Sequence, residues 1–176
     1  MADKRVEDYI LTIPDFPHEG ILFRDVTTVM QDADGFRLAT DALLKALEGV
    51  EFDAVVGVES RGFLFGAPLA YTLHKGFVPV RKQGKLPRET VEKEYALEYG
   101  TAVIEMHTDS IRKGQKVVLI DDLLATGGTT AAAASLIEQL GGEVVKILFL
   151  VELEGLNGRE ALKGYTVDSI VKYEGK

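Results

Sequence analysis

Residues 116–140, KVVLIDDLLATGGTTAAAASLIEQL, decide the fold. The segment begins with a short run of aliphatic residues, which is typical of a strand buried on both faces of a parallel sheet. A glycine-containing turn follows, and the alanine-rich run after it is predicted to be a helix that ends at Gly141 and Gly142. A buried strand that leads through a turn into a helix is a building block of α/β folds.

Strands and helices are predicted to alternate on both sides of this segment. Further strands are expected over residues 53–58, 77–81, 143–153 and 167–173, with weaker alternation over 101–107. Helices are expected over residues 36–47 and 62–74, with a short one over 158–162. We therefore expect residues 1–176 to form one α/β domain with an open, mostly parallel sheet flanked by helices.

Two segments are predicted to lie outside this alternation. Apolar residues at helical spacing between positions 6 and 13 predict an N-terminal helix that ends before Pro14. Residues 14–25 are expected to form a loop with an apolar centre. Residues 82–100 are the most polar part of the chain, and we expect a mobile loop there.

Composition excludes several classes of function. The chain of 176 residues carries 20 Lys and Arg against 28 Asp and Glu, and a net charge of -8 argues against binding to nucleic acid or anionic membranes. Without cysteine it has no disulfide and no thiolate metal site, and its three histidines lie too far apart in sequence for a paired zinc motif. No apolar run reaches the ~20 residues that span a bilayer, so we expect a cytoplasmic protein.

The turn after the strand at 116–122 is predicted to bind a phosphate group. Unpaired N–H groups at a helix N-terminus and the helix dipole attract anions, and glycines let the backbone approach closely. The residues that would do this are Ala125, Thr126, Gly127, Gly128 and Thr129. The alternative is a plain helix cap with threonine as the capping residue.

Asp121 and Asp122 precede this turn. Two carboxylates repel an anion unless a neutral polar group lies between them, and a ribose diol is such a group. The pair therefore predicts a ligand that carries both phosphate and ribose. The alternative is a solvated strand terminus.

Two further groups of residues follow predicted strand ends, where ligands bind in such sheets. The turn Glu59-Ser60-Arg61-Gly62 offers N–H groups and one guanidinium to a diphosphate, although Arg61 is equally able to form a surface salt bridge. Four cations lie close together after the strand at 77–81, and in an acidic chain they suggest a local site for an anion, the alternative being a solvated charge run. They are Arg81, Lys82, Lys85 and Arg88.

The segment VVLIDDLLATGGTT resembles the phosphoribosyl-diphosphate signature of the phosphoribosyltransferases, in the form found in adenine phosphoribosyltransferases. Five other segments resemble that family in the same order along the chain: PDFPHEGILFRDVTTV, GVESRGFLFGAPLA, RKQGKLP, YALEYG and LVELEGLNGRE. The resemblance covers nearly the whole chain. It implies the type I phosphoribosyltransferase fold, with a small base-binding hood at residues 1–34 and a flexible catalytic loop at 82–100.

The resemblance also implies roles on the diphosphate side of the site. The turn from Glu59 holds the leaving diphosphate through Ser60 and Arg61, around a cis peptide between Glu59 and Ser60. Arg81 reaches the diphosphate of its own or a neighbouring subunit, and Lys82 and Lys85 help to bind it.

On the base side, the resemblance implies that the loop at 82–100 closes over the substrates and excludes water. Glu98 is then the acid or base that faces the purine, with Tyr99 near the reacting centre, although from the residues alone Glu98 is one of many exposed glutamates. Phe23 stacks on the base, the backbone of Leu22 and Arg24 reads its edge, and Leu123 covers its other face. For Phe23 the alternative is core packing.

The activity implied by the resemblance is transfer of 5-phosphoribosyl from 5-phosphoribosyl 1-diphosphate to adenine, which gives AMP and diphosphate. Mg²⁺ is expected to bind mainly through the diphosphate, with no direct protein ligands, and a homodimer is expected. One alternative is a transferase for hypoxanthine, guanine, xanthine or orotate. Another is a regulator that senses phosphoribosyl diphosphate, for which a domain of charge -8 offers no basic face.

Overall fold

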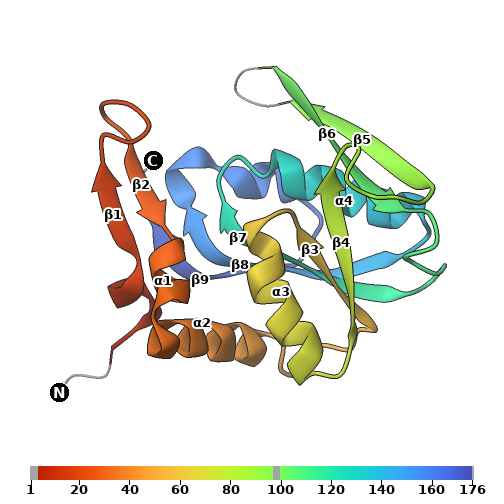
Figure 1. The fold of residues 1–176 in the computed structure, drawn as a ribbon, viewed down its shortest axis with the longest axis horizontal. Coiled ribbons are helices and arrows are strands. Elements are labelled where there is room, and N and C mark those ends of the chain that lie inside the picture. The colour runs from red at the N-terminus through yellow and green to blue at the C-terminus, as the bar shows by residue number, and fades with distance from the viewer. Residues whose placement is uncertain (1–3, 97–99, 176) are drawn as a thin grey trace.

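The computed structural model describes residues 4–96 and 100–175 of the chain. Within them, seven strands form one sheet in the order β5-β6-β4-β3-β7-β8-β9 (Figure 1). The strands are β3 (Ala54–Val58), β4 (Gly76–Lys82), β5 (Thr90–Ala96), β6 (Thr101–His107), β7 (Lys116–Leu124), β8 (Glu143–Leu153) and β9 (Val167–Tyr173). The five strands from β4 to β9 in this order pair in parallel, and β6 and β5 add antiparallel pairs at one edge. The predicted open, mostly parallel sheet is confirmed.

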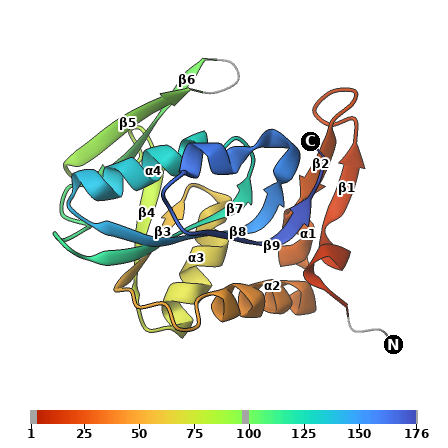
Figure 2. The same ribbon diagram turned by 180° about the vertical axis from the view of Figure 1, so that it is seen from behind.

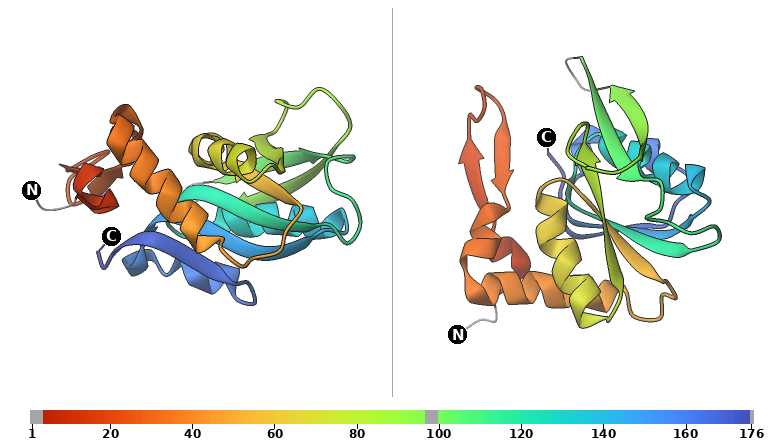
Figure 3. Two further views of the ribbon diagram at one scale, coloured as in Figure 1. Left: turned by 90° about the horizontal axis from the view of Figure 1, so that it is seen from below. Right: turned by 45° about the vertical axis from the view of Figure 1, so that its right-hand side comes forward.

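Helices cover both faces of the sheet. Figure 3 shows α2 (Ala33–Ala46) and α3 (Arg61–Thr72) on one face, and Figure 2 shows α4 (Gly128–Gln139) on the other, where it contacts the 3₁₀ helix η3 (Gly158–Leu162). None of the helices in the described part of the chain has the length and hydropathy that crossing a bilayer demands.

The sheet separates two apolar cores. Leu119 and Phe149 point into the core under α4, whereas Ile120 and Leu148 point into the core under α2 and α3. Successive side chains of a strand point to opposite faces, and here both faces are buried. This explains why the central strands read as continuous apolar runs.

The N-terminal segment forms a separate two-stranded sheet, and the helix predicted between positions 6 and 13 is wrong. A 3₁₀ helix η1 (Val6–Tyr9) is followed by β1 (Leu11–Pro14), which pairs antiparallel with β2 (Leu22–Asp25) inside the predicted loop. Pairing with β2 satisfies the backbone of β1, so this long-range contact overrides the helical spacing of the apolar residues. The short helix α1 (Thr27–Gln31) then leads into α2.

The loop predicted over residues 82–100 is wrong for part of its second half. Strand β5 pairs antiparallel with β6, from Thr90 opposite His107 to Ala96 opposite Thr101. The partner strand supplies the backbone hydrogen bonds, while three successive side chains, Glu92, Lys93 and Glu94, stay exposed. A strand without a continuous buried face leaves no apolar alternation to detect.

The phosphate turn is shorter than predicted. Strand β7 continues through Leu123 and Leu124, which lie opposite Val151 and Glu152 of β8, and α4 begins at Gly128 rather than at residue 131. Glycine and threonine have low helix propensity, so the first turn of α4 is not evident from the residues themselves.

Replacing Leu43 with alanine should lower the free energy of unfolding by about 2–5 kcal/mol, because the substitution leaves a cavity where α2 packs on the sheet. Leu43 is fully buried, whereas Leu11 of β1 is 54% exposed. The same change at Leu11 should therefore cost less than about 1 kcal/mol. Urea unfolding followed by circular dichroism measures both, and equal losses would contradict this packing of α2.

Candidate active site

The carboxyl ends of β3, β4, β7 and β8 meet at one edge of the sheet because these strands run in parallel. In Figure 1 this edge lies between two hairpins, β1-β2 and β5-β6, which rise on opposite sides of it. The right-hand view of Figure 3 shows the same two hairpins apart from each other. Ligands bind at such edges of open α/β sheets, and the turns there carry most of the predicted site residues.

Residues 125–129 form a compact turn that opens α4. Gly127 is the N-cap residue of α4 and has φ +81°, a conformation that favours glycine. A hollow of about 80 Å³ lies against this turn, lined by Asp121 and by residues 123–130. The first N–H groups of α4 have no partners within the helix, so the turn has the geometry of an anion site.

The two aspartates beside the turn have different surroundings. Asp122 is buried and its carboxylate accepts a hydrogen bond from Nε of Arg61, with which it forms an ion pair. Burial opposes the charge of Arg61, but the hydrogen bond and attraction from Asp122 outweigh it and raise the pKa of Arg61. The structure thus brings together two predicted site residues that lie far apart in sequence.

Asp121, unlike Asp122, has no ion pair to stabilise its negative charge among the described residues. Burial and the neighbouring charge of Asp122 raise the pKa of Asp121 well above its ordinary value, so this carboxyl holds a proton more tightly than a free aspartic acid does. Its Oδ1 accepts a hydrogen bond of 2.9 Å from the Asp122 amide. The pair therefore favours one negative charge over two.

The peptide bond between Glu59 and Ser60 is cis, as predicted, in the turn between β3 and α3. The Glu59 carboxylate accepts hydrogen bonds from Nε of Arg81 at 3.1 Å and from the Lys82 amide at 3.0 Å. Burial opposes ionisation of Glu59, but these two donors outweigh it and lower its pKa. The Glu59 side chain thus orients Arg81, which is also predicted to bind the diphosphate.

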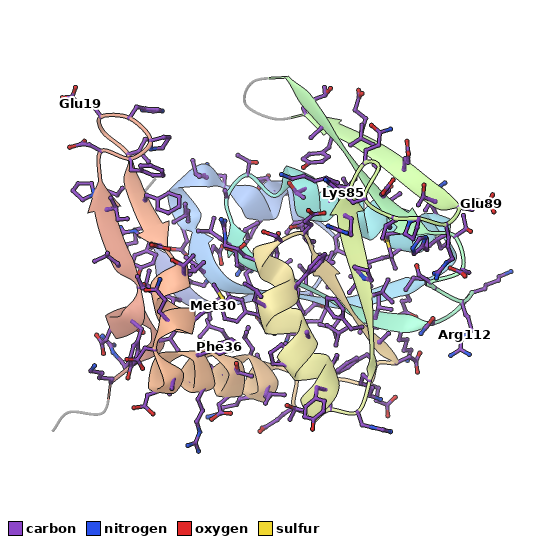
Figure 4. The ribbon with its side chains drawn as sticks, in the orientation of Figure 1. Glu19, Met30, Phe36, Lys85, Glu89 and Arg112 are labelled. Atoms are coloured by element: carbon purple, nitrogen blue, oxygen red, sulfur yellow. The ribbon has the colours of Figure 1, made fainter. Side chains whose placement is uncertain are left out.

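A buried carboxylate shapes the turn that carries the cations. Glu105 of β6 is 2% exposed and accepts hydrogen bonds from the amides of Lys85 and Leu86 at 2.9 and 2.7 Å. Arg81 donates to the Lys85 carbonyl oxygen at 3.2 Å. These bonds hold Lys85 near the end of β4, as Figure 4 shows.

Arg88 does not join the other three cations. It forms an ion pair of 2.9 Å with Asp109, which lies after β6. In Figure 4 the neighbouring Glu89 lies at the outer corner of the molecule, away from Lys85. Arg88 is thus engaged by a carboxylate outside the predicted group of cations.

A pocket of about 660 Å³ lies between the hood and the strand ends. It brings together the four residues predicted to bind a base, and its lining is Ile21, Leu22, Phe23, Arg24, Arg61, Ala96, Leu123, Thr126, Leu153 and Leu156. The ring of Phe23 packs edge-on against Phe16, with centroids 5.1 Å apart, and still faces the pocket. Mostly apolar walls with a few polar groups suit a flat aromatic ligand.

Arg24 anchors the hood to the body of the molecule. Its guanidinium lies 3.9 Å from the ring centroid of Tyr173 in β9 and donates to the hydroxyl of Thr12 in β1. Burial raises the pKa of Tyr173 despite this cation. These contacts fix β2 and with it the main chain of residues 22–24 at the pocket.

The described residues contain no cluster of three or more histidine, aspartate or glutamate side chains suited to a metal ion. One of the two aspartates at the site is paired with Arg61. Glu98 and Tyr99 lie outside the described residues, so their predicted places are untested.

Four pocket residues were not predicted from the sequence, namely Ile21, Ala96, Leu153 and Leu156. The last two belong to the end of β8 and to the 3₁₀ helix η2 (Glu154–Leu156). They follow the carboxyl end of a parallel strand, so the rule that located the other turns also applies to them. Ala96 gave no signal, because its segment was expected to be a loop.

Comparison with known proteins places the chain among phosphoribosyltransferases. A family model described as a phosphoribosyl transferase domain matches residues 31–174, which leaves out the β1-β2 hairpin. An adenine phosphoribosyltransferase of Agathobacter rectalis is 67% identical over 173 residues, which are 98% of this chain and 99% of that protein. One of Lachnoclostridium phytofermentans is 66% identical with the same coverage.

Solved structures of adenine phosphoribosyltransferases are also similar to this chain. The adenine phosphoribosyltransferase of Thermoanaerobacter pseudethanolicus has a TM-score of 0.92 and 55% identity, covering 96% of this chain and 98% of that one. That of Saccharomyces cerevisiae, in complex with an imino-altritol bisphosphate and adenine, has a TM-score of 0.88 and 41% identity, covering 94% and 96%. Both coverages exceed the span of the family model, so they include part of the N-terminal segment that the model leaves out.

Replacing Asp121 with asparagine should raise the melting temperature of the ligand-free protein at about pH 8. The pKa of Asp121 is higher in the folded state than its ordinary value of 3.8, so stability falls as pH rises from 3.8 through the folded pKa. Asparagine keeps an acceptor for the Asp122 amide but carries no charge. The gain should vanish at about pH 3, where Asp121 is protonated in both the folded and the unfolded chain.

Asp109→Asn is the matched control for this change, because its side chain is 66% exposed and pairs with Arg88 at the surface. It should leave the melting temperature nearly unchanged. Differential scanning calorimetry measures both variants. A lower melting temperature for Asp121→Asn at about pH 8 would contradict the unfavourable charge at Asp121.

Proposed function

The chain belongs to the adenine phosphoribosyltransferase family, and on this premise we propose that it transfers the 5-phosphoribosyl group of 5-phosphoribosyl 1-diphosphate to N9 of adenine. The products are AMP and diphosphate. One observation carries this proposal: Leu123 and Thr126, from one strand and the turn after it, line both the apolar pocket and the anion hollow. A base and a phosphate on one ribose would span these two spaces.

The turn at 125–129 is proposed to hold the 5′-phosphate. The N–H groups at the start of α4 and the hydroxyls of Thr126 and Thr129 would donate to its oxygens. Among the described residues that line this hollow there is no lysine or arginine, so the backbone and the helix dipole would supply the attraction.

Asp121 and Asp122 are proposed to bind the ribose hydroxyls. The raised pKa of Asp121 favours a carboxyl that can donate as well as accept, which suits a hydroxyl group, and the carboxylate of Asp122 forms an ion pair with Arg61. As the bond from C1 to the diphosphate oxygen breaks, positive charge grows on the ribose ring. Negative charge at the ion pair of Asp122 and Arg61 would favour it.

The leaving diphosphate is proposed to bind at Ser60, Arg61, Arg81, Lys82 and Lys85. Glu59 and Glu105 hold this group of cations in place through Arg81 and the amides of residues 82, 85 and 86. Orientation before the reaction lowers the barrier because the charges need not rearrange as negative charge gathers on the diphosphate.

Adenine is proposed to lie between Phe23 and Leu123, with the main chain of Leu22 and Arg24 at its edge. The contacts of Arg24 with β1 and β9 keep that main chain in place. Glu98 is proposed to exchange a proton with the purine as N9 attacks C1, since N9 must lose a proton during the transfer.

Mg²⁺ is proposed to accompany the diphosphate substrate. The donor set fits this, because the described residues offer no three-carboxylate cluster and one of the two site aspartates is engaged by Arg61. When bound, the ion neutralises diphosphate oxygens and makes the diphosphate a better leaving group.

Product analysis tests the proposal directly. With adenine, the sugar donor and Mg²⁺, the wild type should form AMP and diphosphate. Asp122→Asn should lower kcat/KM by about 10- to 100-fold, the cost of a hydrogen bond to a charged group. Glu98→Ala should lower kcat by about 10²- to 10⁴-fold, as loss of an acid or base does.

The matched control is Glu94→Ala, since Glu94 is an exposed glutamate of β5 in the same polar segment as Glu98. It should leave turnover close to that of the wild type. Hypoxanthine, guanine, xanthine and orotate serve as competing bases. Faster transfer to any of them than to adenine would overturn the assignment of adenine as the substrate. Wild-type turnover in Asp122→Asn or Glu98→Ala would overturn the role proposed for that residue.

A homodimer is proposed as well, which the exposure of Leu64 and Tyr71 on α3, at 49% and 88%, supports. A second copy would cover these apolar side chains. Tyr71→Arg should then shift the sedimentation coefficient from that of a dimer towards that of a monomer. A monomeric wild type in sedimentation velocity runs would contradict the proposed dimer.

A further inference from the structure

Gly158 and Arg159 follow the pocket residues Leu153 and Leu156 in sequence and have no role in the reaction described above. Gly158, the first residue of η3, packs against the phosphate turn so closely that it admits no side chain. A Cβ at Gly158 would collide with the carbonyl oxygen of Ala125, and a Cβ at Gly127 would collide with the carbonyl oxygen of Gly158. The position of Gly158 therefore sets how far the turn can retreat from the hollow.

Arg159 fixes the position of Gly158. Its guanidinium donates two hydrogen bonds to the carboxylate of Glu152, from Nε at 2.6 Å and from a terminal nitrogen at 2.7 Å. The other terminal nitrogen donates to the carbonyl oxygen of Val167 in β9 at 2.9 Å. The residue next to Gly158 is thus tied to two strands of the rigid sheet.

The carboxylate that receives these bonds is buried. The side chain of Glu152 is 4% exposed, and it also accepts a hydrogen bond from the hydroxyl of Ser169. The hydrogen bonds from Arg159 are the main cause of a lowered pKa for Glu152, against the effect of burial. A bidentate pair of this kind defines direction as well as distance.

We propose that Arg159 and Glu152 are positioning residues for the 5′-phosphate site: their ion pair holds Gly158 against residues 125–127 and so sets the geometry of the phosphate turn. This inference rests on the proposed function, because it takes that turn as the phosphate site. Neither side chain touches the hollow, whose described lining comes from Asp121 and residues 123–130.

The kinetic consequence follows from where the phosphate lies on the substrate. The 5′-phosphate is remote from the C1–O bond that breaks, so it is held equally in the ground state and the transition state. Loss of such uniform binding raises KM and leaves kcat nearly unchanged. A merely destabilised fold would instead lower the amount of active enzyme and weaken every ligand alike.

The experiment compares AMP with adenosine as inhibitors competing with 5-phosphoribosyl 1-diphosphate, for the wild type, Arg159→Met, Arg159→Lys and Lys172→Met. Adenosine lacks the phosphate but keeps the base and the ribose. Arg159→Met removes both hydrogen bonds to Glu152, and Arg159→Lys keeps the charge without the paired donors. Lys172→Met is the matched control, because Lys172 lies 4.0 Å from the same carboxylate and is not adjacent to Gly158.

For Arg159→Met we expect KM for the sugar donor and Ki for AMP to rise about tenfold, with kcat within about threefold and Ki for adenosine within about twofold. Arg159→Lys should raise KM for the sugar donor and Ki for AMP by a smaller factor, again with little change for adenosine. If Arg159→Met does not fold, Arg159→Lys is the variant that tests the inference. Lys172→Met should match the wild type.

Two outcomes would overturn the inference. One is an unchanged Ki for AMP in both Arg159 variants, and the other is an equal rise for AMP and adenosine. The inhibition constants of the wild type show whether the inference or the proposed function is at fault. If the wild type binds AMP no better than adenosine, the proposed phosphate site itself is wrong. If it prefers AMP while the variants lose both ligands equally, the phosphate site stands and the role of Arg159 falls.

Discussion

Parallel pairing of β3, β4, β7 and β8 is the constraint on which the site depends. Parallel strands end at the same edge of a sheet, so turns that lie far apart in sequence are brought side by side there. The sheet is buried on both faces by α2, α3 and α4, which makes this edge rigid. A glycosyl transfer needs such rigidity, because its catalysis is mainly placement of charges around one breaking bond.

Ion pairs and hydrogen bonds at this edge place the charged groups before any substrate arrives. Asp122 holds Arg61, Glu59 holds Arg81, and the buried carboxylate of Glu105 holds the turn at Lys85. Each pairing joins neighbouring strands or the turns after them. Arg61, Arg81 and the turn at Lys85 are thereby held where the diphosphate is proposed to leave, whereas the described lining of the hollow proposed for the 5′-phosphate has no basic side chain.

The central elements were predictable because their residues carry local signals. The buried strand at 116–122 and the glycine turn after it follow from aliphatic runs and turn chemistry, and the resemblance then identified Phe23 and Leu123. The hairpin of β1 and β2 and the strand β5 were missed, since long-range pairing forms them and their faces are largely exposed. Nor did the residues alone reveal that the Glu59 side chain faces Arg81, a contact across 22 positions.

The most direct measurement is a crystal structure of the protein with AMP. The account predicts that the phosphate lies within hydrogen-bonding distance of the amides between Thr126 and Thr129, that the ribose hydroxyls face Asp121 and Asp122, and that the purine lies between Phe23 and Leu123. Nucleotide bound elsewhere, with the turn at 125–129 empty, would contradict the claim on which the proposed reaction rests.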